Sequence, residues 1–316
     1  MTMDFMLSLR VVFPLCVYIG MGMFGKKARL ISPEASKSMN RFTFRALFPL
    51  LMFENVMNAG AALRGNGVSA AVYLLAANTV IFILLMVLIP MIEKSRPRQA
   101  SMIQGAFRSN SILFAMPIVT TICGADQVGV ASICVAIVVP VYNLLSVVAL
   151  ETKRGGSVKA GKLLRGIITN PLIIGAIAGG AALLLGLQLP EIIRTPLHTL
   201  TSMVTPLALM LLGADLKFGH LRQDLKEVLL VTFVKLVFSP LLIIGLAWAL
   251  GFRGLPLISI FALSCVPTAV SSYTMAVEMD ADGPLAGEIV AITTVCSIVT
   301  VFLWVLGLSA MGAFTF

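Results

Sequence analysis

The sequence has few charged residues and lacks the groups on which most soluble enzymes depend. Asp, Glu, Lys and Arg make up only 12% of its 316 residues, whereas soluble domains carry about 25%. It has two histidines, neither beside a candidate nucleophile, five cysteines without a CxxC pair, and no GxxxxGK[ST] motif. These absences argue against a metal site, a disulfide framework and ATP-driven transport. We expect no enzyme activity, no cofactor and no metal.

Long apolar runs are what the sequence has instead. Hydrophobic residues make up 59% of the chain, and a membrane-spanning helix needs about 20 of them in succession. Uncharged runs cover 68–92, 127–150, 166–190, 195–214, 254–277 and 289–316, with less clean runs near 5–25, 42–62, 99–123 and 226–252. The N-terminal run, near 5–25, ends in Gly-Lys-Lys without an A-x-A-like cleavage site, so we interpret it as a spanning helix. The sequence predicts an all-α polytopic membrane protein with ten transmembrane helices.

The basic residues are distributed unequally between the two sets of loops. Eighteen Lys and Arg residues fall in alternate loops, at 26–45, 94–108, 153–165 and 217–226. The opposite side has four, namely Arg10, Arg64, Arg194 and Arg253. Because basic loops stay cytoplasmic, we expect a plasma (inner) membrane protein with both termini outside. A net charge of +9 arranged in this way indicates contact with a lipid bilayer and no nucleic-acid partner.

The prolines suggest an internal repeat. Three of them recur 157 residues later and two recur 150 residues later; the pairs are Pro14/Pro171, Pro33/Pro190, Pro49/Pro206, Pro90/Pro240 and Pro117/Pro267. Their order is preserved, which predicts two five-helix repeats at 1–152 and 153–316. Because five is odd, the second repeat enters the membrane from the other side. Such an inverted repeat is typical of secondary transporters.

Helices four and nine are expected to be broken near Pro117 and Pro267 and to cross near the middle of the membrane. Proline removes a backbone donor, and a broken helix in lipid must face protein or a cavity. Small polar residues cluster at both breaks, and freed N–H groups there would attract an anion. The predicted substrate-binding residues are Ser109, Asn110, Pro117, Tyr142, Asn143, Pro267, Thr268, Ser271 and Ser272. Proline kinks in ordinary packed helices are the alternative.

Three charged residues in the spans are candidates for coupling or gating. Lys235 lies near the predicted midplane, where it would attract a substrate carboxylate, or else snorkel to the interface or bond a carbonyl freed by Pro240. Glu54 is a candidate proton-binding group, with a structural pair at a helix interface as the alternative. Arg108 is either a snorkelling topology anchor or an anion-attracting group. Tyr142 and Asn143 either line the site or form a packed polar pair.

Five segments, in order along the chain, resemble the auxin efflux carrier family of membrane transporters. They are FRSNSILFAMPI (107–118), TNPLIIGAIAGG (169–180), TPLALMLLGADL (205–216), VKLVFSPLL (234–242) and VPTAVSSYTMAVEMDAD (266–282). The resemblance implies a scaffold of helices 1, 2, 6 and 7 that forms a homodimer. It also implies a moving domain of helices 3–5 and 8–10. The family's plant members have an Asn-rich helix nine, whereas this chain has Ser, Thr and Tyr there.

Three classes of function are compatible with these patterns. The favoured class is a secondary carrier of a small organic anion that works by an elevator-type motion with the substrate at the crossing. The resemblance implies that this anion is a malonate-like mono- or dicarboxylate. A sodium-coupled symporter of bile-acid type would share the 5+5 architecture, but it would need more Asn, Gln and Glu oxygens near the crossing. A membrane enzyme or receptor is the third class. We expect potential-driven export or proton-linked uptake, with no sodium requirement.

Overall fold

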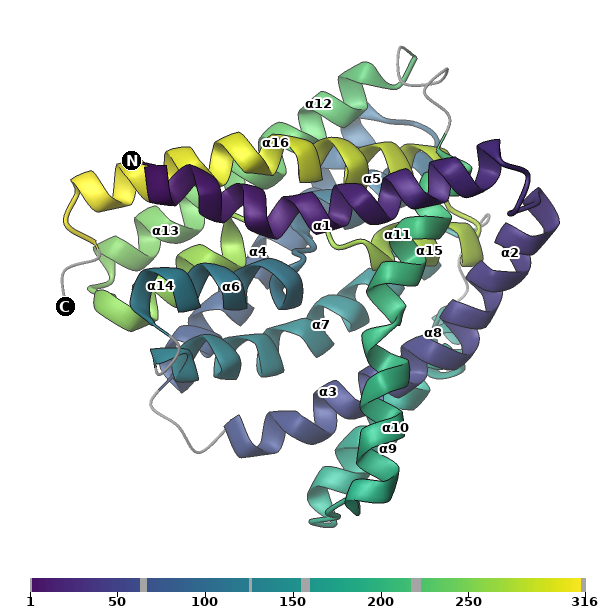
Figure 1. Ribbon diagram of the computed structural model, residues 1–316, viewed down its shortest axis with the longest axis horizontal. Coiled ribbons are helices and arrows are strands. Elements are labelled where there is room, and N and C mark those ends of the chain that lie inside the picture. Colours follow the sequence, from purple (N-terminus) through teal and green to yellow (C-terminus); the bar gives the residue numbers. More distant parts are fainter. Residues whose placement is uncertain (1, 63–66, 125–126, 155–159, 217–222, 314–316) are drawn as a thin grey trace.

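The computed structural model describes residues 2–62, 67–124, 127–154, 160–216 and 223–313, and within them it is helical, without β-strands (Figure 1). This confirms the all-α class. Some residues weighed in the sequence analysis lie outside the described residues. They are Arg64, Lys159, Lys217, Arg222 and one of the two histidines, His220.

Helices with short connections fill the first half of the chain. They are α1 (Thr2–Lys27), α2 (Pro33–Phe42), the π-helical segment η1 (Thr43–Leu47), α3 (Phe48–Ala62), α4 (Val68–Ile92), α5 (Arg96–Phe107), α6 (Ser111–Cys123) and α7 (Gly129–Lys153). Ser32 begins α2 by accepting a hydrogen bond from the Ala35 amide at 3.1 Å, with Pro33 in the first turn. This is the combination expected at a helix start, because proline lacks only an amide that would have no partner there.

The second half is built in the same way. It contains α8 (Ala160–Ile168), α9 (Pro171–Leu184), α10 (Glu191–Ser202), α11 (Val204–Asp215), α12 (Leu225–Phe233), the π-helical segment η3 (Val234–Phe238), α13 (Ser239–Ala249), α14 (Gly254–Ser264), α15 (Ser271–Glu278) and α16 (Gly283–Ala310). Asn170 caps α9 and Asp282 caps α16, each through a hydrogen bond of 3.0 Å from an amide in the first turn. Helical stretches therefore overlap each of the ten predicted runs.

Five stretches within the described residues are long and apolar enough to cross a membrane. They are Val68–Ile92, Gly129–Lys153, Glu191–Asp215, Leu225–Ala249 and Gly283–Ala310. Shorter apolar helices accompany them, including α9 and α14. A polytopic membrane protein is the class that this composition defines. The arrangement of ten spans in two inverted halves stays a prediction.

Both π-helical segments end two residues before a proline. η1 ends before Pro49 and η3 before Pro240. Because proline has no N–H, the carbonyl four residues earlier loses its usual partner. The amide just before each proline bonds five residues back instead, from Phe48 to Thr43 and from Ser239 to Val234. These local shifts keep both stretches continuous, and the second carries Lys235 into the protein interior.

Helix boundaries recur at a nearly constant spacing between the two halves. The first residues of α12, α14, α15 and α16 follow those of α4, α5, α6 and α7 by 157, 158, 160 and 154 residues. The 150-residue spacing of Pro90/Pro240 and Pro117/Pro267 therefore does not relate equivalent positions in the two halves, and this part of the prediction is wrong. Pro90 lies near the end of α4, whereas Pro240 lies in the middle of the Leu225–Ala249 stretch.

Glycines permit close backbone contacts between helices. A Cβ atom at Gly213 of α11 would lie 2.0 Å from the carbonyl oxygen of Ile19 in α1. One at Gly175 of α9 would lie 2.2 Å from the carbonyl oxygen of Pro49 in α3. In each pair two backbones touch without an intervening side chain, which is a frequent mode of helix packing in membranes. The pairs α1/α11 and α3/α9 are thereby fixed at short range.

We expect Gly179→Ala to lower stability and Gly180→Ala to leave it unchanged or raise it. A Cβ atom at Gly179 would lie 2.5 Å from the carbonyl oxygen of Phe53, whereas at Gly180 it would meet only Val56 Cγ1 at 3.9 Å. Both changes improve helix propensity equally, so their difference isolates the contact. Overpacking at Gly179 should cost about 1–2 kcal/mol. Thermal unfolding in detergent measures the difference, and equal midpoints for the two variants would contradict the prediction.

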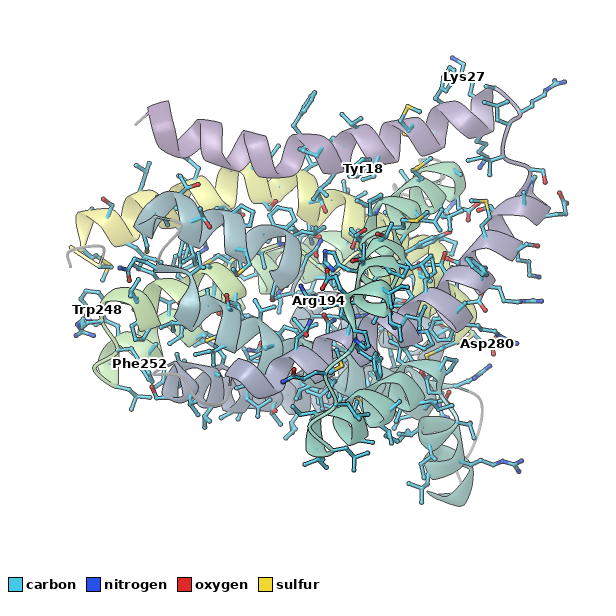
Figure 2. The ribbon with its side chains drawn as sticks, turned by 60° about the horizontal axis from the view of Figure 1, so that its bottom comes forward. Tyr18, Lys27, Arg194, Trp248, Phe252 and Asp280 are labelled. Carbon is cyan, nitrogen blue, oxygen red and sulfur yellow. The ribbon has the colours of Figure 1, made fainter. Side chains whose placement is uncertain are left out.

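The two ends of the molecule carry different residues. α1 begins and α16 ends at the same side of the view, and the two helices run alongside each other (Figure 1). Lys27 and Asp280 lie at one end of the structure and Trp248 and Phe252 at the other (Figure 2). At the latter end, the Arg253 guanidinium lies 4.0 Å from the centre of the Trp248 ring. An aromatic and arginine cluster of this kind is common at a membrane–water interface.

Candidate functional site

Two interrupted helical stretches meet in the interior. The first breaks at 108–110, between α5 and α6, and the second at 265–270, between α14 and α15. The breaks pair as a short antiparallel bridge between Ser109 and Thr268. The amide of Asn110 donates to the Pro267 carbonyl at 2.9 Å, and the amide of Ala269 donates to the Arg108 carbonyl at 3.3 Å. Each break thus satisfies backbone groups of the other, as a buried irregular segment requires.

The position of the first break differs from the prediction. Pro267 lies within the second break, as expected, but Pro117 lies inside the continuous helix α6, seven residues beyond Asn110. Proline is therefore not what interrupts this stretch. The backbone at 108–110 leaves the helix because it pairs with 267–269, and that partner is invisible in the local sequence.

A cavity of about 60 Å³ adjoins the first break. It has room for roughly four water-sized groups, the scale of a small ligand. Of the predicted site residues, Arg108, Ser109, Asn110, Tyr142, Asn143 and Ser271 line it. The wall also includes residues of α3 and α11, so the cavity lies between the paired breaks and these two helices. Tyr142 and Asn143 therefore border a cavity, and both are also buried in the packed interior.

Arg108 is the charged residue of this cavity among the described residues. It is only 3% exposed, so the predicted snorkelling anchor is wrong. Its guanidinium donates to Asn143 Oδ1 and lies 2.8 Å from Met275 Sδ. With the Gln104 amide turned to suit its neighbours, Gln104 also accepts from Arg108 at 3.2 Å. No carboxylate of the described chain lies within 4 Å of Arg108, so its positive charge is balanced by dipoles alone.

Further hydrogen-bond donors without partners in the described chain line the same cavity. Asn110 Nδ2, Asn55 Nδ2 and Ser111 Oγ are buried and have no hydrogen-bond partner within the described residues, and all three residues line the cavity. Buried donors are normally satisfied, because leaving one unpaired costs about 1–3 kcal/mol. A set of unpaired donors beside a guanidinium is complementary to a carboxylate or another small anion.

The N-termini of two helices add to the positive potential in the cavity. α6 begins at Ser111 and α15 at Ser271, and both residues border the cavity. The first amides of a helix carry no intrahelical partner and have a partial positive charge. The two half-helices therefore direct their positive ends toward the space that Arg108 already makes positive, an arrangement that favours anions.

Lys235 lies directly behind the cavity wall. It is 2% exposed and donates to Ser109 Oγ, which lines the cavity. The predicted snorkelling and the predicted bond to a carbonyl freed by Pro240 are both wrong. The π-helical segment η3 and the paired break bring Lys235 and Ser109 together across 126 residues. A second buried basic side chain without a described carboxylate partner thus lies beside the cavity.

Four predicted site residues lie outside the cavity wall. Thr268 Oγ1 donates to the Gly105 carbonyl at 2.7 Å, so this side chain fastens the crossing. The Pro267 carbonyl accepts the Asn110 amide. Ser272 is buried one residue beyond Ser271, and Pro117 is half-buried in α6. Their positions fit support of the crossing better than contact with a ligand.

Glu54 pairs with α10 and does not line the cavity. It accepts hydrogen bonds from Thr201 Oγ1 and contacts His198 Nδ1 at 2.9 Å. The structural pair named as the alternative for Glu54 is what the geometry contains. Its neighbour Asn55 is the cavity residue, which sequence reasoning missed because Glu54 carries the charge. Ser111 was noted in the polar cluster, and Thr205 of α11 gave no separate signal.

A second, wider cavity of about 340 Å³ lies near the end that carries Asp280. Arg45, Glu151, Arg154 and Glu278 line it. Burial lowers the pKa of the Arg154 guanidinium, but Asp280 at 2.6 Å and Glu151 at 3.2 Å outweigh this, so that its pKa is raised. This cavity is charged at its rim, where Arg154, unlike Arg108, is paired with carboxylates.

Comparison with known proteins assigns the family. A family model described as "membrane transport protein" matches residues 7–305. The chain belongs to this family, which confirms the resemblance drawn from the sequence. A protein described as an uncharacterized transporter, from Methanothermobacter thermautotrophicus, is 32% identical over 110 residues. That alignment spans 35% of this chain and 36% of the relative's length. The protein is thus a multi-pass membrane protein of a transporter family, and these matches point away from an enzyme.

Proposed function

We propose that the protein is a secondary transporter of a small organic anion and that the substrate binds at the crossing of the two broken stretches. The observation that carries the proposal is a cavity whose charged member, Arg108, has no carboxylate partner in the described chain. Unpaired donors from Asn110, Asn55 and Ser111 surround it. A malonate-like mono- or dicarboxylate fits this donor set, because a carboxylate accepts several hydrogen bonds at once.

The proposal extends to two inverted five-helix repeats, 1–152 and 153–316. Support comes from helix starts that recur after 154–160 residues. The glycine contacts agree: α1 contacts α11, in the seventh predicted span, and α3 contacts α9, where the second span meets the sixth. If span one is equivalent to span six, and span two to span seven, then the α1/α11 contact is equivalent to the α3/α9 contact.

The mechanism proposed is an elevator-type motion. Spans 1, 2, 6 and 7 form the scaffold, and spans 3–5 and 8–10 carry the crossing past it. The cavity wall supports this division, because α3 and α11 face the paired breaks across it. We further propose a homodimer through the scaffold, in the plasma (inner) membrane with both termini outside. The separation of Lys27 from Trp248 along the molecule is compatible with this orientation (Figure 2).

Uptake by proteoliposomes tests the proposal. A panel of labelled mono- and dicarboxylates, malonate included, would be offered with and without pH and sodium gradients. We expect saturable uptake of at least one acid and no need for sodium. Steep dependence on sodium at fixed pH and clamped potential would favour the sodium-coupled symporter of bile-acid type. Lack of transport of every acid in the panel by folded protein would refute the proposal.

We expect Asn110→Ala to weaken binding of the transported acid about tenfold. Loss of one hydrogen bond to a charged acceptor is worth about 1.5 kcal/mol. Isothermal titration in detergent measures the affinity. Ser264→Ala is a suitable control, because Ser264 lies next to the other break and its hydroxyl donates to the Ile260 carbonyl within its own helix. Unchanged affinity in folded Asn110→Ala protein would place the substrate elsewhere.

A further inference from the structure

A cluster of carboxylates surrounds Arg98 at the start of α5. The guanidinium lies within 4 Å of four acidic side chains, which come from the α4–α5 connection, the region of α12 and the start of α16. These are Glu93 at 3.0 Å, Asp224 at 2.7 Å, Glu227 at 3.2 Å and Asp282 at 3.7 Å. Their side chains are 11–25% exposed, so the cluster borders the aqueous phase.

Glu288 lies beneath this cluster and is different from its members. It is 5% exposed, and neither of its carboxylate oxygens has a hydrogen-bond partner within the described residues. Asp224, Asp282 and Arg98 are the charged groups close enough to act on it. Because Arg98 already binds four carboxylates, little of its charge is available to a fifth.

The other acids of the cluster have defined tasks. Asp224 and Glu227 bind Arg98, and Asp282 caps α16 by accepting the Leu285 amide at 3.0 Å. Burial tends to raise the pKa of Glu93, but bonds from the Ser95 amide and Arg98 outweigh this, so its pKa is lowered. Glu93 therefore stays ionised, which leaves Glu288 as the carboxylate without a counterpart.

We propose that Glu288 is a proton-binding site and that its proton crosses the membrane together with the substrate anion. A buried carboxylate without donors is costly when ionised, and Asp224 and Asp282 add repulsion. Taking one proton from the adjoining aqueous phase converts it to a neutral carboxylic acid; releasing that proton on the other side restores the anion. This inference rests on the proposed transport of an anion and names the ion that accompanies it.

Charged groups on the remaining neighbours of α16 are already occupied or exposed. Lys235 of η3 bonds Ser109, and Glu278 of α15 accepts from Asn40 at 3.3 Å. The described charged side chains of α1, Lys26 and Lys27, are exposed. None of these offers a counter-ion to Glu288.

The cluster is joined to the substrate cavity by two helices. Arg98 and Arg108 are ten residues apart across α5, or about 15 Å at 1.5 Å per residue. Glu227 and Lys235 are eight residues apart on the Leu225–Ala249 stretch, or about 12 Å. In the proposed division, all of these elements belong to the moving domain. A proton on Glu288 would travel with the anion and cancel one unit of the charge moved against the membrane potential.

Two measurements on the full-length protein in liposomes test the proposal, and one needs no substrate. Infrared difference spectra between pH 5 and pH 8 report protonation of carboxylic acids directly. We expect a titrating carboxylic-acid band in the wild type that Glu288→Gln removes and Glu288→Asp retains. Glu191→Gln is the control, because Glu191 is an exposed carboxylate that pairs with Arg194 at 3.4 Å and accepts a hydrogen bond from Thr195 Oγ1 at 3.1 Å. In the transport assay, an inward proton gradient drives uptake of labelled malonate, or of the acid found by the panel. Glu288→Gln should reduce this uptake at least tenfold, while anion exchange persists.

The outcomes separate this inference from the proposed function. A wild-type band that survives in folded Glu288→Gln protein, or full pH-gradient stimulation in that variant, overturns the proton site. Loss of pH dependence in Glu54→Gln with retention in Glu288→Gln assigns the proton to Glu54 and also overturns it. If no acid is transported by the wild type, the proposed function fails, and the infrared band alone still decides whether Glu288 titrates.

Discussion

Arg108→Gln is expected to abolish measurable uptake of the transported anion. The guanidinium is buried, lines the cavity and has no carboxylate partner in the described chain, so the substrate would supply its counter-charge. Removing one member of a buried charge pair costs about 3–5 kcal/mol, or roughly 10²–10⁴-fold in affinity. Arg108→Lys should retain part of the binding, because it keeps the charge but loses the two-pronged geometry. Binding and uptake in proteoliposomes measure both effects.

A matched control separates charge from fold. Arg194→Gln removes an exposed guanidinium of α10, paired with Glu191 on the surface, and should leave uptake as in the wild type. Thermal unfolding should place Arg108→Gln close to the wild type, since the variant loses the bond to Asn143 but also the cost of burying an ion. Wild-type affinity in folded Arg108→Gln protein would show that Arg108 does not bind the substrate.

Lys235→Met is expected to change stability and binding in opposite directions. The buried ammonium has only Ser109 as a described partner, so an apolar side chain of similar length should hold or raise the unfolding midpoint. Binding of the anion should fall by about 2 kcal/mol, which is about half of the interaction between two unit charges 4 Å apart at an effective dielectric constant near 20. That corresponds to roughly 30-fold in affinity. Titration and thermal unfolding on the same sample measure both.

Lys226→Met provides the comparison for Lys235→Met. Lys226 is exposed on α12, nine residues earlier in the same helical stretch, and should affect neither property strongly. A lower unfolding midpoint for Lys235→Met would mean that the ammonium stabilises the crossing beyond its bond to Ser109. Unchanged affinity would mean that its charge does not reach the substrate.

The helical stretches were accessible from local patterns, but the break in the first of the crossing stretches was not. Uncharged runs of about 20 residues require helices in lipid, because each backbone group must find a partner within its own segment. Pro117 indicated an interruption, yet α6 continues through it. The chain leaves the helix at 108–110, where its backbone pairs with residues almost 160 positions away. A local signal cannot report such a partner.

The candidate site shows the same division among individual residues. Asn110, Ser109, Tyr142 and Asn143 were found because small polar groups stand out in apolar runs. Asn55 was missed beside the charged Glu54, although it is Asn55 that lines the cavity. Glu288 was missed because the uncharged run that predicted the last helix begins at residue 289. α16 in fact begins at Gly283 and carries Glu288 into the interior.

The sequence by itself determined the class of protein, its helical segments and the small set of polar residues within them, since the cost of placing polar groups in lipid acts on each residue separately. Only the tertiary structure decided how those residues are used. It placed Arg108 and Lys235 beside one cavity, gave Glu54 a partner and left Glu288 without one among the described residues. Whether a buried charge is paired depends on neighbours brought from distant segments, so this property arises only when the helices pack.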